Sequence, residues 1–250
     1  MAEHTLTAYM QALEDGAEAL ECDVRLTADG HLVCVHDRRI DRTSSGSGVV
    51  STLQLEELQA LDWRSWKNPW RELDDEADDD AAEPVLTLQR LLDTVADWGR
   101  PVDVAIETKH PTRYAGLVER RLIELLDSYG WANPRHQQPS PIRVMSFSWL
   151  SLRRCLDLAP GLQMVYLMEH IPLLLRDGTL PSGATAAGPS IEIVRAAPDY
   201  VGRCHDAGHP VHVWTVNTAA DLDLCASVGV DAVVTDKPAA ALDRLTRSAH

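Results

Sequence analysis

Charged side chains alternate with apolar ones near the start of the chain, where Glu21, Asp23 and Arg25 occupy every second position of residues 20–26. Side chains of a β-strand alternate between its two faces, so these three would share one face. On a half-exposed strand that face would simply meet water. Inside an α/β barrel it would place two carboxylates where an unpaired charge is costly, and a hard cation that prefers oxygen ligands would offset that cost.

A carboxylate and a lysine end a second apolar run. In residues 102–109, Glu107 and Lys109 fall on one face at the carboxyl end of a predicted strand. Barrel enzymes place their catalytic groups at that end. A structural Glu–Lys ion pair at a loop mouth explains the same pattern equally well.

Two histidines also lie on predicted strands. His36 ends residues 32–36 and is followed by Asp37 and a run of charges, which indicates a polar strand end and makes a role in proton transfer reasonable. His212 is in phase with Trp214, and Trp214 is either core packing or a pocket wall. The pattern alone gives His212 no catalytic role.

The elements that position these residues alternate between strand and helix. Strands are predicted at residues 19–26, 32–36, 102–106, 142–147, 163–167, 184–188, 211–216 and 232–235. Helices are predicted at residues 5–15, 53–61, 87–98, 113–126, 150–158, 191–205, 219–228 and 239–246. Such alternation implies a parallel sheet with helices outside it. For 250 residues a TIM-type (β/α)₈ barrel fits better than an open sheet.

The mouth of this barrel would gather three carboxylates, one lysine and at least one histidine. A bound cation neutralises phosphoryl oxygens, a lysine adds positive charge, and a histidine moves protons. The set therefore predicts metal-assisted hydrolysis of an anionic ester.

The charge balance excludes several classes of protein. With 23 Lys and Arg against 38 Asp and Glu, the formal net charge is −15, which argues against a nucleic-acid binder and against stable association with an anionic membrane. Residues 72–83 hold no base, and such a run is typical of a solvated loop. Eight acids lie in this run: Glu72, Asp74, Asp75, Glu76, Asp78, Asp79, Asp80 and Glu83.

Cysteine usage and the N-terminus favour the cytoplasm. The 5 cysteines are odd in number, widely spaced and without a Cys-x-x-Cys pair, so neither a disulfide framework nor a zinc site is indicated. Residues 1–6 show no basic and apolar secretory signal. If the true start lies upstream, that observation is uninformative.

Short motifs occur in order along residues 3–238. They are Glu3-His4-Thr5-Leu6, Glu21-Cys22-Asp23-Val24, Asp29-Gly30, Val35-His36-Asp37, Asp41-Arg42-Thr43, Gly46, Gly48, Ile106-Glu107-Thr108-Lys109, Ser146-Phe147, Val213-Trp214-Thr215-Val216-Asn217, Gly229-Val230-Asp231 and Thr235-Asp236. In this order they resemble the glycerophosphodiester phosphodiesterase family. The resemblance implies a TIM barrel that hydrolyses deacylated phospholipids, such as glycerophosphocholine or glycerophosphoethanolamine, to sn-glycerol 3-phosphate and an alcohol. It also implies a divalent cation, usually Ca²⁺ or Mg²⁺.

The resemblance carries roles over position by position. It implies three metal carboxylates, one catalytic histidine, one phosphate-facing lysine and two pocket walls: Glu21, Asp23 and Glu107, then His36, Lys109, and Phe147 with Trp214. Cys22 and Thr108 replace apolar residues often found between these ligands. Strand alternation points both away from the site, so we count them as neutral.

One part of the family pattern is missing. The family opens with a strand ending in His-Arg-Gly, whose histidine is the first catalytic acid or base and whose arginine helps to hold phosphate. This chain begins after that place, and His4 lies in the helix-start motif and does not align with it. We expect a barrel without its first strand. We favour a reading frame that starts too late over a truly shortened and impaired chain, because the other site residues are intact.

Three functions follow from these observations. The first is the metal-dependent hydrolase, acting on a small molecule within a single barrel domain over residues 1–250 with an acidic insertion at 72–83. The second is a barrel that binds a phosphodiester without turnover, which the missing His-Arg supports. The third is a phospholipase-type phosphodiesterase, disfavoured by the net charge and by the lack of an apolar docking loop. The nearest thing to such a loop is the group of Trp63, Trp66 and Trp70, but their spacing is more typical of one face of a helix. Head group, metal and oligomeric state stay open.

Overall fold

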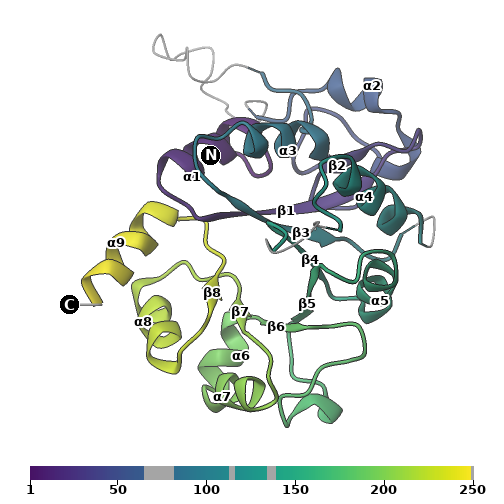
Figure 1. The fold of residues 1–250 in the computed structure, drawn as a ribbon. Coiled ribbons are helices and arrows are strands. Elements are labelled where there is room, and N and C mark those ends of the chain that lie inside the picture. Colours follow the sequence, from purple (N-terminus) through teal and green to yellow (C-terminus); the bar gives the residue numbers. More distant parts are fainter. Residues whose placement is uncertain (65–81, 113–115, 134–138, 249–250) are drawn as a thin grey trace.

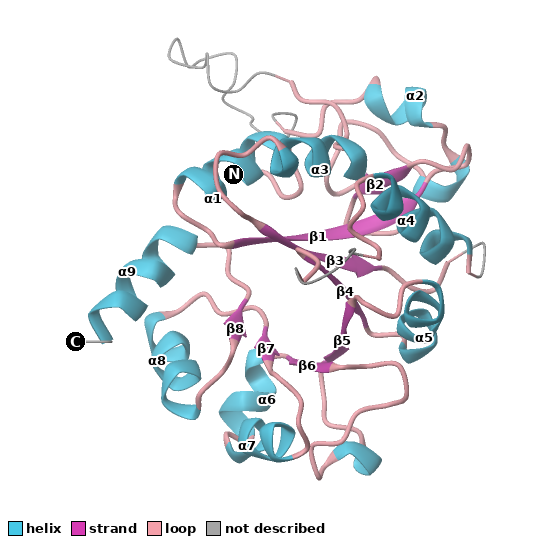
Figure 2. Ribbon diagram, viewed as in Figure 1, coloured by secondary structure: helices cyan, strands magenta, loops and turns pink. Residues whose placement is uncertain are grey.

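The chain forms a curved sheet surrounded by helices, as Figures 1 and 2 show. This is a computed structural model, and it describes residues 1–64, 82–112, 116–133 and 139–248. The strands of this part are β1 (Ala19–Leu26), β2 (Leu32–Cys34), β3 (Asp103–Thr108), β4 (Ile142–Ser146), β5 (Gln163–Met168), β6 (Ala186–Pro189), β7 (His212–Val213) and β8 (Ala232–Val233). The predicted alternation of strand and helix is confirmed.

The helices cover the outer face of the sheet (Figure 2). They are α1 (Leu6–Glu14), α2 (Leu55–Gln59), α3 (Leu88–Ala96), α4 (Leu117–Ser128), α5 (Trp149–Leu158), α6 (Ile191–Ala196), α7 (Asp199–Asp206), α8 (Ala219–Val228) and α9 (Pro238–Ser248), with single 3₁₀ turns at Val50–Thr52 and Leu173–Leu175. Side-chain hydroxyls cap several of them. Thr5, Thr87 and Thr218 each accept a hydrogen bond from a backbone N–H of the first turn that follows.

The order of the strands is that of a parallel barrel with one added hairpin strand. The main sheet runs β2-β1-β3-β4-β5-β6, and only β2 is antiparallel to its neighbour among its pairings. Parallel bridges Ala187–Val211 and Ser190–Trp214 continue it to the β7–β8 pair. In the described part of the chain no strand pairing joins β8 to β1, and the missing first strand stays a prediction.

Alternation along the strands separates an outer core from the barrel interior. On β3, Val104 and Ile106 pack into the cluster that contains Leu91 of α3 and Leu122 of α4. Ala105, between them, belongs instead to the interior cluster. Helix packing against one face therefore dictates that the other face, with its polar residues, points inward.

Several predicted boundaries differ from those observed. The helix predicted at 191–205 is two helices, because Pro198 lacks an N–H and disfavours the helical conformation at Ala197, whose φ and ψ are −145° and 71°. Trp63 follows the end of α2 and is buried with its indole N–H donated to Leu58. The prediction that it shares a helix face with Trp66 and Trp70 is wrong for Trp63, and the other two lie outside the described residues.

The acidic run is only partly described, since its residues 72–81 lie outside the described residues. Glu83 is not a solvated loop residue as predicted. Its carboxylate accepts hydrogen bonds from the backbone N–H of Leu6 at 2.5 Å and from the Thr7 hydroxyl at 3.0 Å. Glu83 thus satisfies free donors at the amino end of α1, where a negative charge is favourable.

Candidate active site

Strand β1 delivers two carboxylates to the barrel interior. Cys22 and Val24 are fully buried in the outer core, so the residues between and before them, Glu21 and Asp23, face the opposite way. Asp23 is buried, with 4% of its surface exposed. The predicted shared face of the strand is confirmed.

Parallel pairing brings the third carboxylate alongside. Asp23 of β1 is in register with Glu107 of β3, so the two side chains project from neighbouring strands on the same face. Together with Glu21 they offer ligand oxygens that all lie within 4.8 Å of one another. The structure therefore brings together the three residues predicted as metal ligands.

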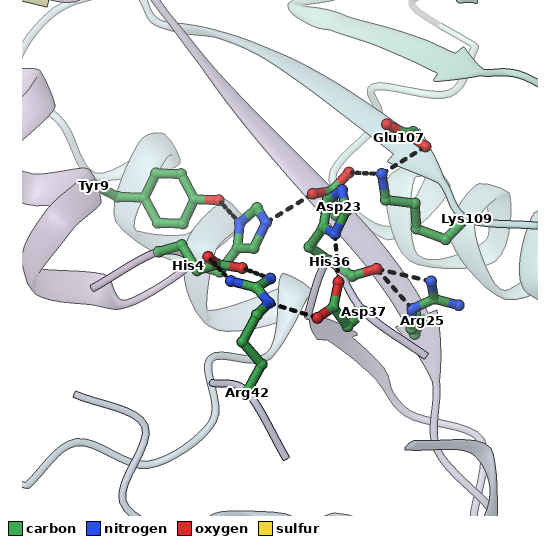
Figure 3. Close-up of polar contacts among 10 residues, drawn as sticks. His4, Tyr9, Asp23, Arg25, His36, Asp37, Arg42, Glu107 and Lys109 are labelled. Atoms are coloured by element: carbon green, nitrogen blue, oxygen red, sulfur yellow. Dashed lines mark hydrogen bonds and ion pairs between the residues drawn. The ribbon is translucent and has the colours of Figure 1, made fainter. Parts of the chain in front are cut away.

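Lys109 lies between two of these acids (Figure 3). Its ammonium is 3.0 Å from Asp23 Oδ1 and 2.9 Å from Glu107 Oε1. The Glu–Lys contact expected from a purely structural pair is thus present, but it is inside the barrel and shared with Asp23. Burial alone would lower the pKa of Lys109, and the two carboxylates raise it, so the ammonium stays charged.

Crowding perturbs the acids in different directions. Burial and then the charge of Asp23 raise the pKa of Glu107 to about 7, and burial with its acidic neighbours raises the pKa of Glu21 well above its ordinary value. Burial also opposes ionisation of Asp23, but His4 and Lys109 hold its pKa below the usual range. Such divergence among neighbouring acids is typical of functional sites.

His4, given no role by the sequence, contacts the carboxylate cluster. Its Nε2 lies 2.8 Å from Asp23 Oδ2 and its Nδ1 lies 2.6 Å from the Tyr9 hydroxyl. A carboxylate only accepts hydrogen bonds, so Nε2 donates to Asp23 and the tyrosine hydroxyl donates to Nδ1. The contact depends on how α1 packs against β1, and no spacing in the sequence reveals it.

His36 is oriented by the residue that follows it. Its Nδ1 donates to Asp37 Oδ1 at 2.7 Å, and Arg42 holds the other carboxylate oxygen of Asp37 at 2.6 Å. The hydrogen bond from Arg42 is the main reason why the pKa of Asp37 falls to about 2. Arg42 is itself clamped by both oxygens of Glu3. In the neutral ring, Nε2 is then free to accept a proton.

One cavity collects all the predicted site residues. It has a volume of about 210 Å³. Its lining includes Glu21, Asp23, His36, Glu107, Lys109, Phe147 and Trp214. Phe147 and Trp214 meet edge to face with ring centroids 5.4 Å apart, and the Trp214 indole N–H donates to the Gly188 carbonyl at 2.7 Å. The two aromatics thus form an apolar part of the cavity lining.

Three residues that were not expected to act in the site, Cys22, Thr108 and His212, lie outside the lining of its cavity. Cys22 is in the outer core, and the Thr108 hydroxyl is 2.8 Å from that of Ser151 on α5. His212 is buried, and burial is the first reason why its pKa falls to about 4. It does not line the cavity.

A buried ion pair supports the segment after Lys109. Glu119 on α4 is fully buried, with Arg154 at 3.2 Å and His110 at 3.5 Å from its Oε1. Burial alone would raise the pKa of Glu119, but interactions with His110, a backbone N–H and Arg154 lower it to about 2. Because the folded pKa lies below the unfolded one, this carboxylate stabilises the fold above about pH 4.3 and progressively less toward pH 2.

Glu119→Gln should therefore lower the free energy of unfolding by about 3 kcal/mol at pH 7. The deficit relative to the unmodified chain should shrink as the pH approaches 2. Urea denaturation across this pH range measures both effects. Glu124→Gln on the exposed side of the same helix, where it removes a surface pair with Arg121, should change stability by less than about 1 kcal/mol. Equal effects of the two substitutions would contradict the buried role of Glu119.

Comparison with known proteins settles the family. The sequence profile of the "Glycerophosphoryl diester phosphodiesterase family" matches residues 1–240. The chain belongs to this family. The predicted identification as a phosphoric diester hydrolase of the family is thereby confirmed.

Relatives with the family's name cover most of this chain. "Probable glycerophosphodiester phosphodiesterase 1" of Mycobacterium tuberculosis is 44% identical over 236 residues, which are 94% of this chain and 85% of the relative. "Glycerophosphodiester phosphodiesterase" of Bacillus subtilis is 32% identical over 246 residues, covering 94% of this chain and 79% of the relative.

Solved structures of family members share the fold. A phosphodiesterase from Oleispira antarctica, solved with the product sn-glycerol-3-phosphate, superposes with a TM-score of 0.80 at 22% identity, covering 98% of this chain and 92% of that one. A glycerophosphodiester phosphodiesterase from Parabacteroides distasonis gives a TM-score of 0.78 at 23% identity, covering 100% and 92%. The TIM-barrel prediction is confirmed. None of the helices in the described ranges has the length and apolar content to cross a membrane.

Proposed function

We propose that this chain hydrolyses glycerophosphodiesters of the glycerophosphocholine and glycerophosphoethanolamine type to sn-glycerol 3-phosphate and an alcohol. The observation that carries the proposal is one cavity whose lining includes a cluster of three carboxylates, a lysine and an aspartate-oriented histidine. It occurs in a chain of a family whose relatives are named for this activity.

Glu21, Asp23 and Glu107 would hold a divalent cation, Ca²⁺ or Mg²⁺. The donor set is all oxygen, as these hard cations prefer. Asp23 Oδ1 is buried, and its contact with the Lys109 ammonium at 3.0 Å lacks hydrogen-bond geometry, so this oxygen keeps lone pairs that a cation can use. When bound, such a cation neutralises the phosphoryl oxygens and makes phosphorus more open to attack.

Lys109 and His36 supply the chain's own chemistry. The charged Lys109 side chain faces the phosphate and stabilises the charge that builds up on its oxygens. The Nε2 atom of His36 moves a proton, either from the attacking oxygen or to the departing alcohol. The attacking oxygen is that of water or of the substrate's own glycerol hydroxyl. A new P–O bond forms and the P–O bond to the alcohol breaks, while the alcohol oxygen takes up a proton. Attack by the hydroxyl gives a cyclic glycerol phosphate, whose ring water then opens to sn-glycerol 3-phosphate.

Phe147 and Trp214 form the apolar side of the substrate pocket. Phe147 is 40% exposed at the cavity mouth, so its ring is free to pack against the carbon atoms of the glycerol or the alcohol.

We place this machinery in a single barrel domain over residues 1–250 with an acidic insertion at 72–83. Its substrate is a small molecule rather than a nucleic acid, it forms no stable association with a membrane, and its compartment is the cytoplasm.

A lipid phosphodiesterase is the second candidate, and apolar exposure favours it. Trp149 and Leu150, which follow β4, are 50% and 44% exposed, and Leu173 and Leu174, which follow β5, are 71% and 86% exposed. Both segments follow the carboxyl ends of barrel strands, where the site opens. Exposed large apolar side chains at such a place suit contact with an acyl chain.

Product analysis tests the proposal. Purified protein with Mg²⁺ or Ca²⁺ is incubated with glycerophosphocholine, and ³¹P NMR follows the phosphorus. We expect the diester signal to give way to that of glycerol 3-phosphate. Formation of phosphocholine, or binding without any product, would overturn the proposal. Lysophosphatidylcholine in a parallel reaction should be cleaved more slowly, and faster cleavage of it would favour the lipid enzyme.

A further inference from the structure

A second cavity adjoins the candidate active site. It has a volume of about 250 Å³ and lies between the end of β1, the turn at Val50–Thr52 and the segment after β3. Lys109 lines both this cavity and the active-site cavity. Arg25 lines the new one and lies two residues beyond Asp23, a distance of about 7 Å along the strand.

The charge of the lining reverses between the two cavities. The active-site cavity is lined by four acidic residues: Glu21, Asp23, Glu107 and Glu169. The lining of the second cavity includes Arg25, Arg38 and Lys109, and no acid is among its described lining residues. In a chain with a net charge of −15, a cavity whose charged lining residues are all cationic is a local signal for an anionic ligand.

The two arginines lack ionic partners within the described ranges. Arg25 donates from Nε and Nη2 to the His36 carbonyl at 3.0 and 2.7 Å (Figure 3), which leaves other guanidinium N–H groups unused. Among the residues that the structure describes, the Arg38 guanidinium makes no hydrogen bond or ion pair, whereas its neighbour Arg39 pairs with Asp41 at 3.0 Å. A guanidinium binds carboxylate or phosphate through two parallel hydrogen bonds, so both side chains are suited to an anion.

The rest of the lining limits the size and polarity of the ligand. Leu26, Val50 and Pro111 form an apolar wall, and Ser51 and Thr112 add hydroxyl groups. The volume accommodates a short carbon chain with one anionic end. Since Lys109 lines both cavities, a substrate whose phosphodiester lies in the active-site cavity can extend its head group into the second one.

We propose that this cavity is a head-group subsite for glycerophosphodiesters whose alcohol carries a second anionic group, a carboxylate or a phosphate. This rests on the proposed function. Arg38 and Arg25 bind the anion while the phosphodiester occupies the adjoining site. The chain therefore prefers an anionic head group to a cationic one.

Two substrates that differ by one carboxylate test the preference. Glycerophosphoserine is glycerophosphoethanolamine with an added carboxylate. We expect kcat/KM for glycerophosphoserine to exceed that for glycerophosphoethanolamine about tenfold, the factor expected for one charge-assisted contact.

Arg38→Gln should bring this ratio of kcat/KM values close to one, and Arg38→Lys should retain part of the preference. Arg38 is the cleaner probe because Arg25 also holds the His36 loop. Arg120→Gln removes an exposed charge outside the cavity and should leave the ratio unchanged.

A binding measurement separates this proposal from the proposed function. Calorimetry with Mg²⁺ present compares phosphoserine with phosphoethanolamine and needs no turnover. We expect phosphoserine to bind about tenfold more tightly, and Arg38→Gln to abolish the difference. Equal affinities in the unmodified chain, or a preference untouched by Arg38→Gln, would overturn the subsite even if the diesters are hydrolysed. Absence of any hydrolysis alongside selective phosphoserine binding would overturn the proposed function alone.

Discussion

Glu21→Gln should lower kcat/KM for glycerophosphocholine by about 10²- to 10³-fold. The substitution keeps the shape of the side chain but removes the charge. Glu21 lies on the interior face of β1 with its ligand oxygen within 4.8 Å of those of Asp23 and Glu107. Without the charge of Glu21, the cluster keeps only Asp23 and Glu107, and both already form ion pairs with Lys109. Calorimetric titration with Mg²⁺ should show a cation affinity lower by at least about tenfold.

Glu169→Gln is the matched control for this prediction. Glu169 lines the same cavity and is exposed, but it is not one of the three clustered carboxylates. Its substitution should change cation affinity by less than about twofold, the effect of an exposed charge in a screened setting. Unchanged cation affinity in Glu21→Gln, with the fold intact by circular dichroism, would remove Glu21 from the proposed metal site.

His36→Ala should lower kcat by about 10²- to 10⁴-fold, the usual contribution of a general acid or base. The side chain lines the cavity and is 53% exposed, so its loss should cost little stability. Asp37→Asn should have a smaller effect in the same direction, because it weakens the hydrogen bond that fixes the ring while leaving the ring in place. KM should change much less than kcat in both variants.

His31→Ala provides the control. His31 is also exposed and close to an aspartate, 3.8 Å from Asp29, but it does not line the cavity. Its kinetic constants should match those of the unmodified chain. A His36→Ala variant that keeps its kcat and changes only KM would show that His36 binds substrate without moving a proton.

The candidate site was largely predictable because strands have a strict period of two. The alternation of Glu21, Asp23 and Arg25 specified which side chains face inward once helices were placed outside the sheet. The pairing of Asp23 with Glu107 was not predictable from periodicity, because the register between strands distant in sequence depends on the whole sheet. Motif resemblance supplied that link.

Contacts between distant segments account for what the sequence left undetermined. His4 reaches Asp23 only because α1 packs beside β1, and Glu83 caps α1 from a segment far along the chain. Lys109 as a bridge between two acids likewise requires three-dimensional placement. The break between α6 and α7, by contrast, had a local signal in Pro198, which the helical periodicity of the flanking residues obscured.

The most direct test of the account is a cation titration of hydrolysis. The protein is stripped with a chelator, and glycerol 3-phosphate release from glycerophosphocholine is measured as Mg²⁺ or Ca²⁺ is added back. We expect negligible release from the stripped protein and saturable recovery by the cation, with the recovery lost in Glu21→Gln. Full release by the stripped protein, indifferent to added cation, would contradict the proposed cluster of Glu21, Asp23 and Glu107 as a metal centre.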